Sequence, residues 1–116
     1  MLNLSDMIRG CTDTIILAQI LDKDGYGYEI NKQVLRLSDG MLELKEATLY
    51  TTFRRLESGG FIRSYWGDEA TGARRRYYAV TELGKQLYRE NLSDWKKIRT
   101  VIDLLLKGET AHESEN

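Results

Sequence analysis

The chain has 116 residues, with one cysteine and no proline, and 41% of its residues are hydrophobic and 30% charged. This length fits one domain, and the composition is that of an ordinary soluble globular protein. No run approaches the eighteen or so apolar residues of a membrane span, and the N-terminus lacks the basic region of a signal peptide. The single cysteine, Cys11, cannot form an internal disulfide. We therefore expect a cytoplasmic protein with no membrane partner.

Charge is distributed unevenly along the chain. The net charge is −1 and the isoelectric point about 5.9, which by themselves argue against a polyanionic partner. Between Lys45 and Arg76, however, seven Lys or Arg residues stand against four acidic ones, a net charge of +3. We therefore expect a compact basic surface in the middle of the chain. Residues 108–116 carry three glutamates and are expected to form an acidic, disordered tail.

The first predicted element is a helix from about residue 6 to 21. Ser5 is its expected N-cap, and apolar residues recur at helical spacing from Ile8 and Cys11 onward. Apolar residues cover so much of its circumference that the helix is expected to be buried on more than one side, partly against a partner subunit.

Two further helices follow the turn at residues 22–27. One is predicted over 28–37 and the other over 46–58, where Gly59 and Gly60 end it. Between these helices, residues 41–44 alternate between apolar and polar side chains, which favours a very short strand.

The second half of the chain predicts a β-hairpin and a long last helix. Segments 61–66 and 74–80 are rich in aromatic and β-branched residues, with a polar tip between them. Thr81 is the expected N-cap of a helix that continues to about Lys107. Three helices followed by a hairpin are typical of a winged helix-turn-helix. We therefore expect a mainly α fold with a small β-hairpin, a winged helix-turn-helix over 5–80, and a C-terminal dimerisation helix over 81–107.

The third predicted helix offers a polar face. Its apolar residues Leu49, Phe53 and Leu56 must face the core, which turns a polar set outward, with Tyr50 on the flank. The outward set is Ala47, Thr48, Thr51, Arg54 and Arg55. Small and hydroxylic residues let a helix enter a major groove, and arginines can hold phosphates. A plain solvated face is an equal alternative on composition alone.

An arginine triplet begins the second strand of the hairpin. Alternation sends Arg74 and Arg76 to one side and Arg75 to the other. Guanidinium groups on a wing beside a helix can grip phosphates or enter a minor groove, although such a triplet is more often only a charged surface. Tyr77 and Tyr78 are expected to be packing residues.

The C-terminal helix carries an apolar seam. Leu83 and Leu87 come early, and then Trp95, Ile98, Ile102 and Leu105 follow at three-four-three spacing. A helix too long for so small a domain to cover is expected to pair with its symmetry mate, giving a homodimer. Trp95 is either interface packing or one wall of a ligand pocket at the dimer centre.

No catalytic or metal-binding pattern is present in the sequence. The only histidine, His112, lies in the acidic tail, and Cys11 has no histidine near it. No cluster has metal-ligand spacing, and no glycine-rich loop precedes a helix. We expect neither an enzyme nor a cofactor.

Several ordered segments resemble the PadR family of bacterial transcriptional regulators. The matching segments are 26–30, 47–50 with 55–57, 60–62, 65–66, 75–78 and 83–84. The resemblance implies a homodimeric repressor that binds a palindromic operator in double-stranded DNA. The DNA contacts that we then expect are Lys45, Thr48, Tyr50, Thr51, Arg55, Arg74, Arg75 and Arg76.

The single C-terminal helix with a tryptophan midway resembles the multidrug-sensing, LmrR-like branch of that family. This likeness implies that a small planar aromatic or drug-like effector binds at the dimer interface and relieves repression. The implied ligand contacts are Met7, Asp13, Thr14, Leu17, Trp95 and Ile98.

Two alternatives remain at this point. The winged helix could be a module that binds protein through the same face, which salt-dependent retention on DNA would distinguish. The chain could also be a DNA-binding regulator with no small-molecule ligand, in which Trp95 only packs.

Overall fold

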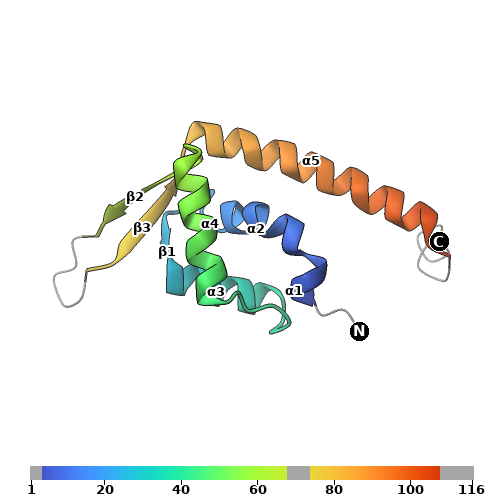
Figure 1. Ribbon diagram of the computed structural model, residues 1–116, viewed down its shortest axis with the longest axis horizontal. Coiled ribbons are helices and arrows are strands. Elements are labelled where there is room, and N and C mark those ends of the chain that lie inside the picture. The colour runs from blue at the N-terminus through green and yellow to red at the C-terminus, as the bar shows by residue number, and fades with distance from the viewer. Residues whose placement is uncertain (1–3, 68–73, 108–116) are drawn as a thin grey trace.

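The computed structural model describes residues 4–67 and 74–107, which form a helical body, a small sheet and a long terminal helix (Figure 1). The elements are, in order, α1 (Leu4–Met7), the 3-10 helix η1 (Arg9–Cys11), α2 (Thr12–Gln19), β1 (Gly25–Tyr26), α3 (Gly27–Leu37), α4 (Glu46–Ser58), β2 (Ile62–Trp66), β3 (Arg76–Val80) and α5 (Glu82–Leu105). The predicted tail and most of the hairpin tip lie outside the described residues. No helix in the described ranges is both long and apolar enough to cross a membrane.

The sheet has three antiparallel strands in the order β1-β3-β2. β2 and β3 form the predicted hairpin, in which Ile62 lies opposite Val80 and Trp66 opposite Arg76. β1 was not predicted: its two residues pair with Tyr77 and Tyr78 of β3 and so anchor the start of α3 to the wing. The fold is thus mainly helical with a small sheet, as expected for a winged helix.

The core lies between α2, α3, α4 and the inner face of the sheet. Ile16 and Leu17 of α2 and Ile20, which follows this helix, are fully buried there with Ile30 of α3. At its centre, the ring of Phe53 stacks on that of Tyr78, with centroids 3.9 Å apart. Packing of α4 on the sheet therefore fixes this helix relative to the hairpin.

The N-terminal helix is broken, contrary to the prediction of one continuous helix. α1 already includes Ser5, so this residue is not an N-cap, and a 3-10 turn separates α1 from α2. Gly10 weakens the helix there, and the Thr12 hydroxyl donates to the Arg9 carbonyl oxygen at 3.1 Å. These local effects favour the tighter turn over a continuous α-helix.

Residues 41–44 are not a strand. Leu42 and Leu44 are buried and Met41 and Glu43 exposed, so the alternation reflects burial alone. The Asn31 side chain satisfies the backbone instead: its amide donates to the Leu44 carbonyl at 2.7 Å, and its carbonyl accepts from the Leu44 N–H at 3.0 Å. An amide side chain thus takes the place of a neighbouring strand.

The start of α5 is capped as predicted. The Thr81 hydroxyl accepts from the Gly84 N–H at 3.1 Å and donates to the Gly60 carbonyl at 2.7 Å. Gly84 packs closely, because a Cβ there would lie 2.0 Å from the Phe61 carbonyl oxygen. From this anchor α5 extends away from the hairpin and gives the molecule its long axis of 55 Å (Figure 1).

Candidate nucleic-acid interface

α4 presents a polar face to solvent along its length. Leu49, Phe53 and Leu56 are buried, whereas the predicted outward set is exposed. That set comprises Ala47, Thr48, Thr51, Arg54 and Arg55. Thr52, at the edge of this face, is buried, and its hydroxyl donates to the Thr48 carbonyl at 2.8 Å. The helix is therefore oriented as its periodicity predicts.

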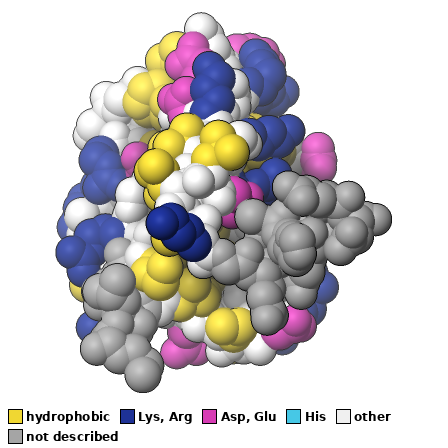
Figure 2. Space-filling model, turned by 90° about the vertical axis from the view of Figure 1, so that its right-hand side faces the viewer, with side chains coloured by type: hydrophobic (Ala, Val, Ile, Leu, Met, Phe, Trp, Pro, Cys, Tyr) yellow, Lys and Arg dark blue, Asp and Glu magenta, His cyan; other side chains and the backbone are white. Residues whose placement is uncertain are grey.

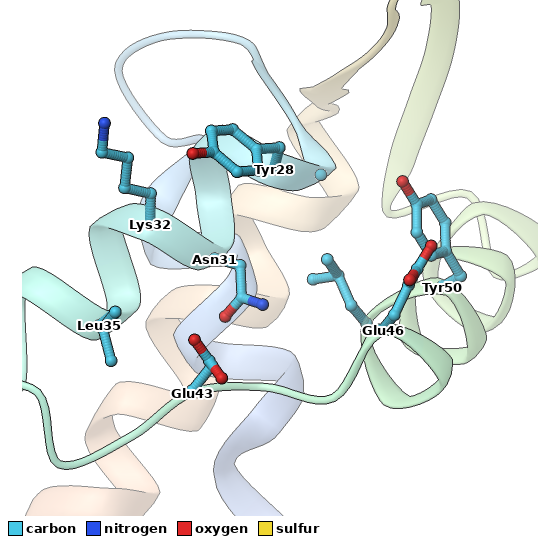
Figure 3. Close-up of a pocket in the computed structure, with 9 residues that line it drawn as sticks. Tyr28, Asn31, Lys32, Leu35, Glu43, Glu46 and Tyr50 are labelled. Carbon is cyan, nitrogen blue, oxygen red and sulfur yellow. The ribbon is translucent and has the colours of Figure 1, made fainter.

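Tyr50 lies beside a hollow of about 450 Å³ between α3 and α4 (Figure 3). Its ring meets Phe53 edge-on, with centroids 5.6 Å apart. A Cβ on Gly27 would come within 2.8 Å of the Tyr50 hydroxyl, so glycine allows the close approach of α3. Glu43 and Glu46 line the same hollow. Tyr50 is thus held at the edge of the α4 face, next to a hollow that Lys32 lines together with the two glutamates.

Arg55 forms an ion pair with Asp13 of α2. The sequence assigned these residues to two separate sites, Arg55 to DNA and Asp13 to a ligand. The structure brings the two side chains together on the flank of α4, and both remain partly exposed. No pattern in the sequence links residues 42 positions apart.

The wing arginines lie on aromatic rings on opposite sides of the strand, as alternation predicts. The guanidinium carbons of Arg74 and Arg76 lie 5.2 and 5.7 Å from the Trp66 ring centroid, and that of Arg75 lies 4.7 Å from the Tyr26 centroid. Cation–π contacts of this kind hold a guanidinium in place over the face of the ring. Trp66, which the sequence analysis did not single out, therefore positions two of the three arginines.

Arg76 is also tied to α4. Its Nη2 donates to the Ser64 hydroxyl at 2.8 Å, and the Ser64 hydroxyl donates to the Glu57 carboxylate at 2.6 Å. Arg76 Nη2 lies 3.7 Å from the other Glu57 oxygen. The polar groups of Arg76 therefore join the wing to α4, and its expected contact with DNA stays a prediction. Glu57 and Ser64 were missed, because the packing of α4 on β2 brings Glu57 to the wing and the hairpin register places Ser64 only diagonally from Arg76.

A row of tyrosines crosses the other face of the sheet. Tyr77 stacks on Tyr65 at 5.7 Å and meets Tyr26 edge-on at 5.5 Å. The Tyr65 hydroxyl donates to Asp24 at 2.5 Å, and this hydrogen bond raises the pKa of Tyr65 above its ordinary value. Burial raises the pKa of Tyr78 on the core side. These contacts fasten β1 to the wing.

The far half of α5 exposes its apolar seam. Trp95 is 44% and Ile98 54% exposed, and hydrophobic side chains gather on the side of the molecule where α5 ends (Figure 2). Of the expected ligand contacts, Met7 is also exposed and Thr14 half-buried. Leu17 is corrected: it is fully buried in the core and has no surface for a ligand.

Comparison with protein families decides what kind of protein carries this arrangement. The model of the transcriptional regulator PadR-like family matches residues 16–90. The chain belongs to the PadR-like family of transcriptional regulators. Members of this family are regulators and not enzymes, which confirms the expectation from the sequence.

Individual relatives agree with this placement. The uncharacterized protein X of Lysinibacillus sphaericus is 44% identical over 104 residues, which are 90% of this PadR-like chain and 95% of that protein. A transcriptional regulator from Clostridium thermocellum has a TM-score of 0.82 at 43% identity, covering 89% of this chain and all of that one. PadR of Bacillus subtilis, solved in complex with operator DNA, shares the fold, with a TM-score of 0.63 at 22% identity over 70% of this chain and 46% of that one.

Proposed function

We propose that this PadR-like protein is a cytoplasmic, sequence-specific DNA-binding repressor that acts as a homodimer. The observation that carries the proposal is the exposed polar face of α4 beside a wing whose arginines are held on aromatic rings and tied to α4. A helix with small hydroxylic residues next to fixed guanidinium groups suits major-groove recognition with phosphate contacts beside it. The operator complex of Bacillus subtilis PadR supports the same use of this fold.

The residues divide by role. Thr48 and Thr51 are small enough to let α4 approach the base edges closely, and Tyr50 at the flank can donate to a phosphate. Lys45, at the N-cap of α4, and Arg55 supply positive charge beside the groove. Arg74 and Arg75 serve as the phosphate contacts of the wing, while Arg76 acts through its ties to α4.

A second copy of the chain is the proposed occupant of the α5 seam. Trp95, Ile98, Val101 and Ile102 are each at least 44% exposed, and apolar residues at this spacing pair helices efficiently. Residues 5–80 would then form the DNA-binding domain and 81–107 the dimerisation helix. Two-fold symmetry would in turn require a palindromic operator.

Relief by a small planar aromatic effector is the finer part of the proposal. Trp95, Ile98, Met7, Thr14 and Asp13 would contact it at the dimer centre. Such an effector releases DNA only if it binds the DNA-incompetent dimer more tightly, since equal affinity shifts no equilibrium.

A mobility-shift assay with DNA from upstream of the protein's own gene tests the proposal. We expect a saturable shift that survives excess nonspecific competitor and weakens with salt. Without such a shift, fragments of the whole genome are selected with the immobilised protein. If neither experiment yields a specific site, the proposal is wrong and the same face serves protein recognition.

A further inference from the structure

A second hollow lies on the other flank of α4, facing the N-terminal segment. It measures about 290 Å³, and apart from Ala47 its lining residues are threonines and arginines. The lining residues are Arg9, Thr12, Ala47, Thr48, Thr51, Thr52 and Arg55. Thr48, Thr51 and Arg55 belong to the face that we assign to DNA, so this hollow adjoins the proposed recognition surface.

Arg9 reaches this hollow because of the break in the N-terminal helix. η1 carries Arg9 at its start, and the Thr12 hydroxyl fixes the Arg9 carbonyl at 3.1 Å. The fold thus brings an arginine that precedes the family match at residues 16–90 to the edge of α4. The sequence analysis gave Arg9 no role, because it lies in an apolar segment far from the basic window.

Asp13 of α2 positions the second arginine of this hollow. Its carboxylate pairs with Arg55 and holds that guanidinium at the edge of the hollow. A guanidinium has five N–H donors, so one carboxylate contact leaves others available. The Thr51 hydroxyl accepts from Arg54 at 3.3 Å, which leaves its own proton to donate. The hollow thus offers guanidinium and hydroxyl donors, which are the groups that bind the oxygens of a phosphodiester.

We propose that this hollow is a phosphate-binding site for the DNA backbone, in which Arg9 and Arg55 supply the charge, Thr48 and Thr51 the hydroxyl donors, and Asp13 positions Arg55. The inference rests on the proposed function and extends its interface to the N-terminal segment. Each protomer would then hold a backbone phosphate on both sides of the recognition helix, from the wing on one side and from η1 on the other.

The test uses the full-length protein and a fluorescein-labelled mixed-sequence 24-bp duplex, since backbone contacts do not depend on an operator. Anisotropy titrations between 50 and 200 mM KCl give the slope of log Kobs against log[KCl]. Arg9→Gln and Arg9→Met should each make the slope shallower by about 0.9 per bound protomer. Arg9→Lys keeps the charge and should keep the wild-type slope.

Two further variants serve as controls. Arg89→Gln removes the same charge from α5, which does not line the hollow, and should leave the slope unchanged. Arg75→Gln removes a proposed phosphate contact of the wing and should make the slope shallower. Thermal unfolding of each variant confirms that it is folded.

The outcomes separate the two claims. If Arg75→Gln makes the slope shallower but Arg9→Gln and Arg9→Met both keep the slope of the wild type and of Arg89→Gln, the phosphate site is wrong and the proposed function stands. If the wild-type protein shows no salt-dependent binding to duplex DNA, the proposed function and this site fail together.

Discussion

The guanidinium of Arg76 in β3 lies 3.7 Å from the carboxylate of Glu57 in α4, and the hydroxyl of Ser64 in β2 links the two groups by hydrogen bonds. The recognition helix and the wing are thus joined by side chains as well as through the core. Both charged groups are partly exposed, so the pair itself contributes about 1 kcal/mol or less to stability. The main expected consequence of this ion pair is that it holds the wing at a fixed angle to α4.

Glu57→Gln should therefore weaken operator binding several-fold, because the wing is no longer held at the angle that places Arg74 and Arg75. Removal of a negative charge near DNA would, by electrostatics alone, strengthen binding. The two effects have opposite signs, so an affinity measurement separates them. Tighter binding by Glu57→Gln would contradict the positioning role.

Arg76→Gln should weaken operator binding more than Glu57→Gln, since it breaks the same contact and also removes a positive charge, and the double variant should be little weaker than Arg76→Gln alone. Residues that act through one shared contact are not additive. Additive losses in this double-mutant cycle would mean that Arg76 contacts DNA directly.

Ile98→Asp should convert the proposed dimer to a monomer at micromolar concentration. A carboxylate in the apolar seam of α5 costs at least about 2 kcal/mol on pairing, which is roughly a thirtyfold loss in association. Sedimentation velocity measures the change. Thr100→Asp, which lies on the opposite side of the same helix, is the matched control and should stay dimeric; equal behaviour of the two variants would argue against the seam.

Gly84→Ala should destabilise the fold by about 1–3 kcal/mol, since the added methyl would overlap the Phe61 carbonyl oxygen. The matched control is Gly10→Ala, where a Cβ meets nothing within 4 Å. Thermal melts of both variants test the close approach of α5 to Phe61, the residue before β2. A melting temperature for Gly84→Ala equal to that of Gly10→Ala would contradict it.

Tyr65 should titrate at a pH above its ordinary pKa of 10.0, because its hydroxyl donates to Asp24. A pKa raised on folding means that the folded state holds the proton more tightly. The stabilising contribution is therefore complete below about pH 10 and is lost as the pH rises through the folded-state pKa. Absorbance titration of the phenolates measures this step, which Tyr65→Phe should remove and Asp24→Asn should move to lower pH. An unchanged titration in Asp24→Asn would show that the hydrogen bond is not the cause.

Much of this architecture is predictable from local sequence. α4 begins at Glu46 and ends at Ser58 as predicted, because its apolar positions follow one face and two glycines follow it. The sides taken by Arg74, Arg75 and Arg76 follow from strand alternation, and the Thr81 cap from residue preference. In each case the determining interactions lie within a few residues along the chain.

The parts that were missed depend on contacts between distant residues. β1 exists only because β3 supplies its partners, and residues 41–44 avoid a strand because Asn31 satisfies their backbone. The Asp13–Arg55 pair depends on how α2 packs beside α4. No periodicity in the sequence encodes these neighbours.

The most direct test of the account is the equilibrium affinity of the wild-type protein for a duplex that carries its operator and for a scrambled duplex of equal length and composition. Anisotropy titrations at 50 to 200 mM KCl provide both values. The account predicts that the operator binds at least about a thousandfold more tightly and that both affinities fall with salt. Equal affinity for the two duplexes, or affinities that do not change with salt, would contradict it.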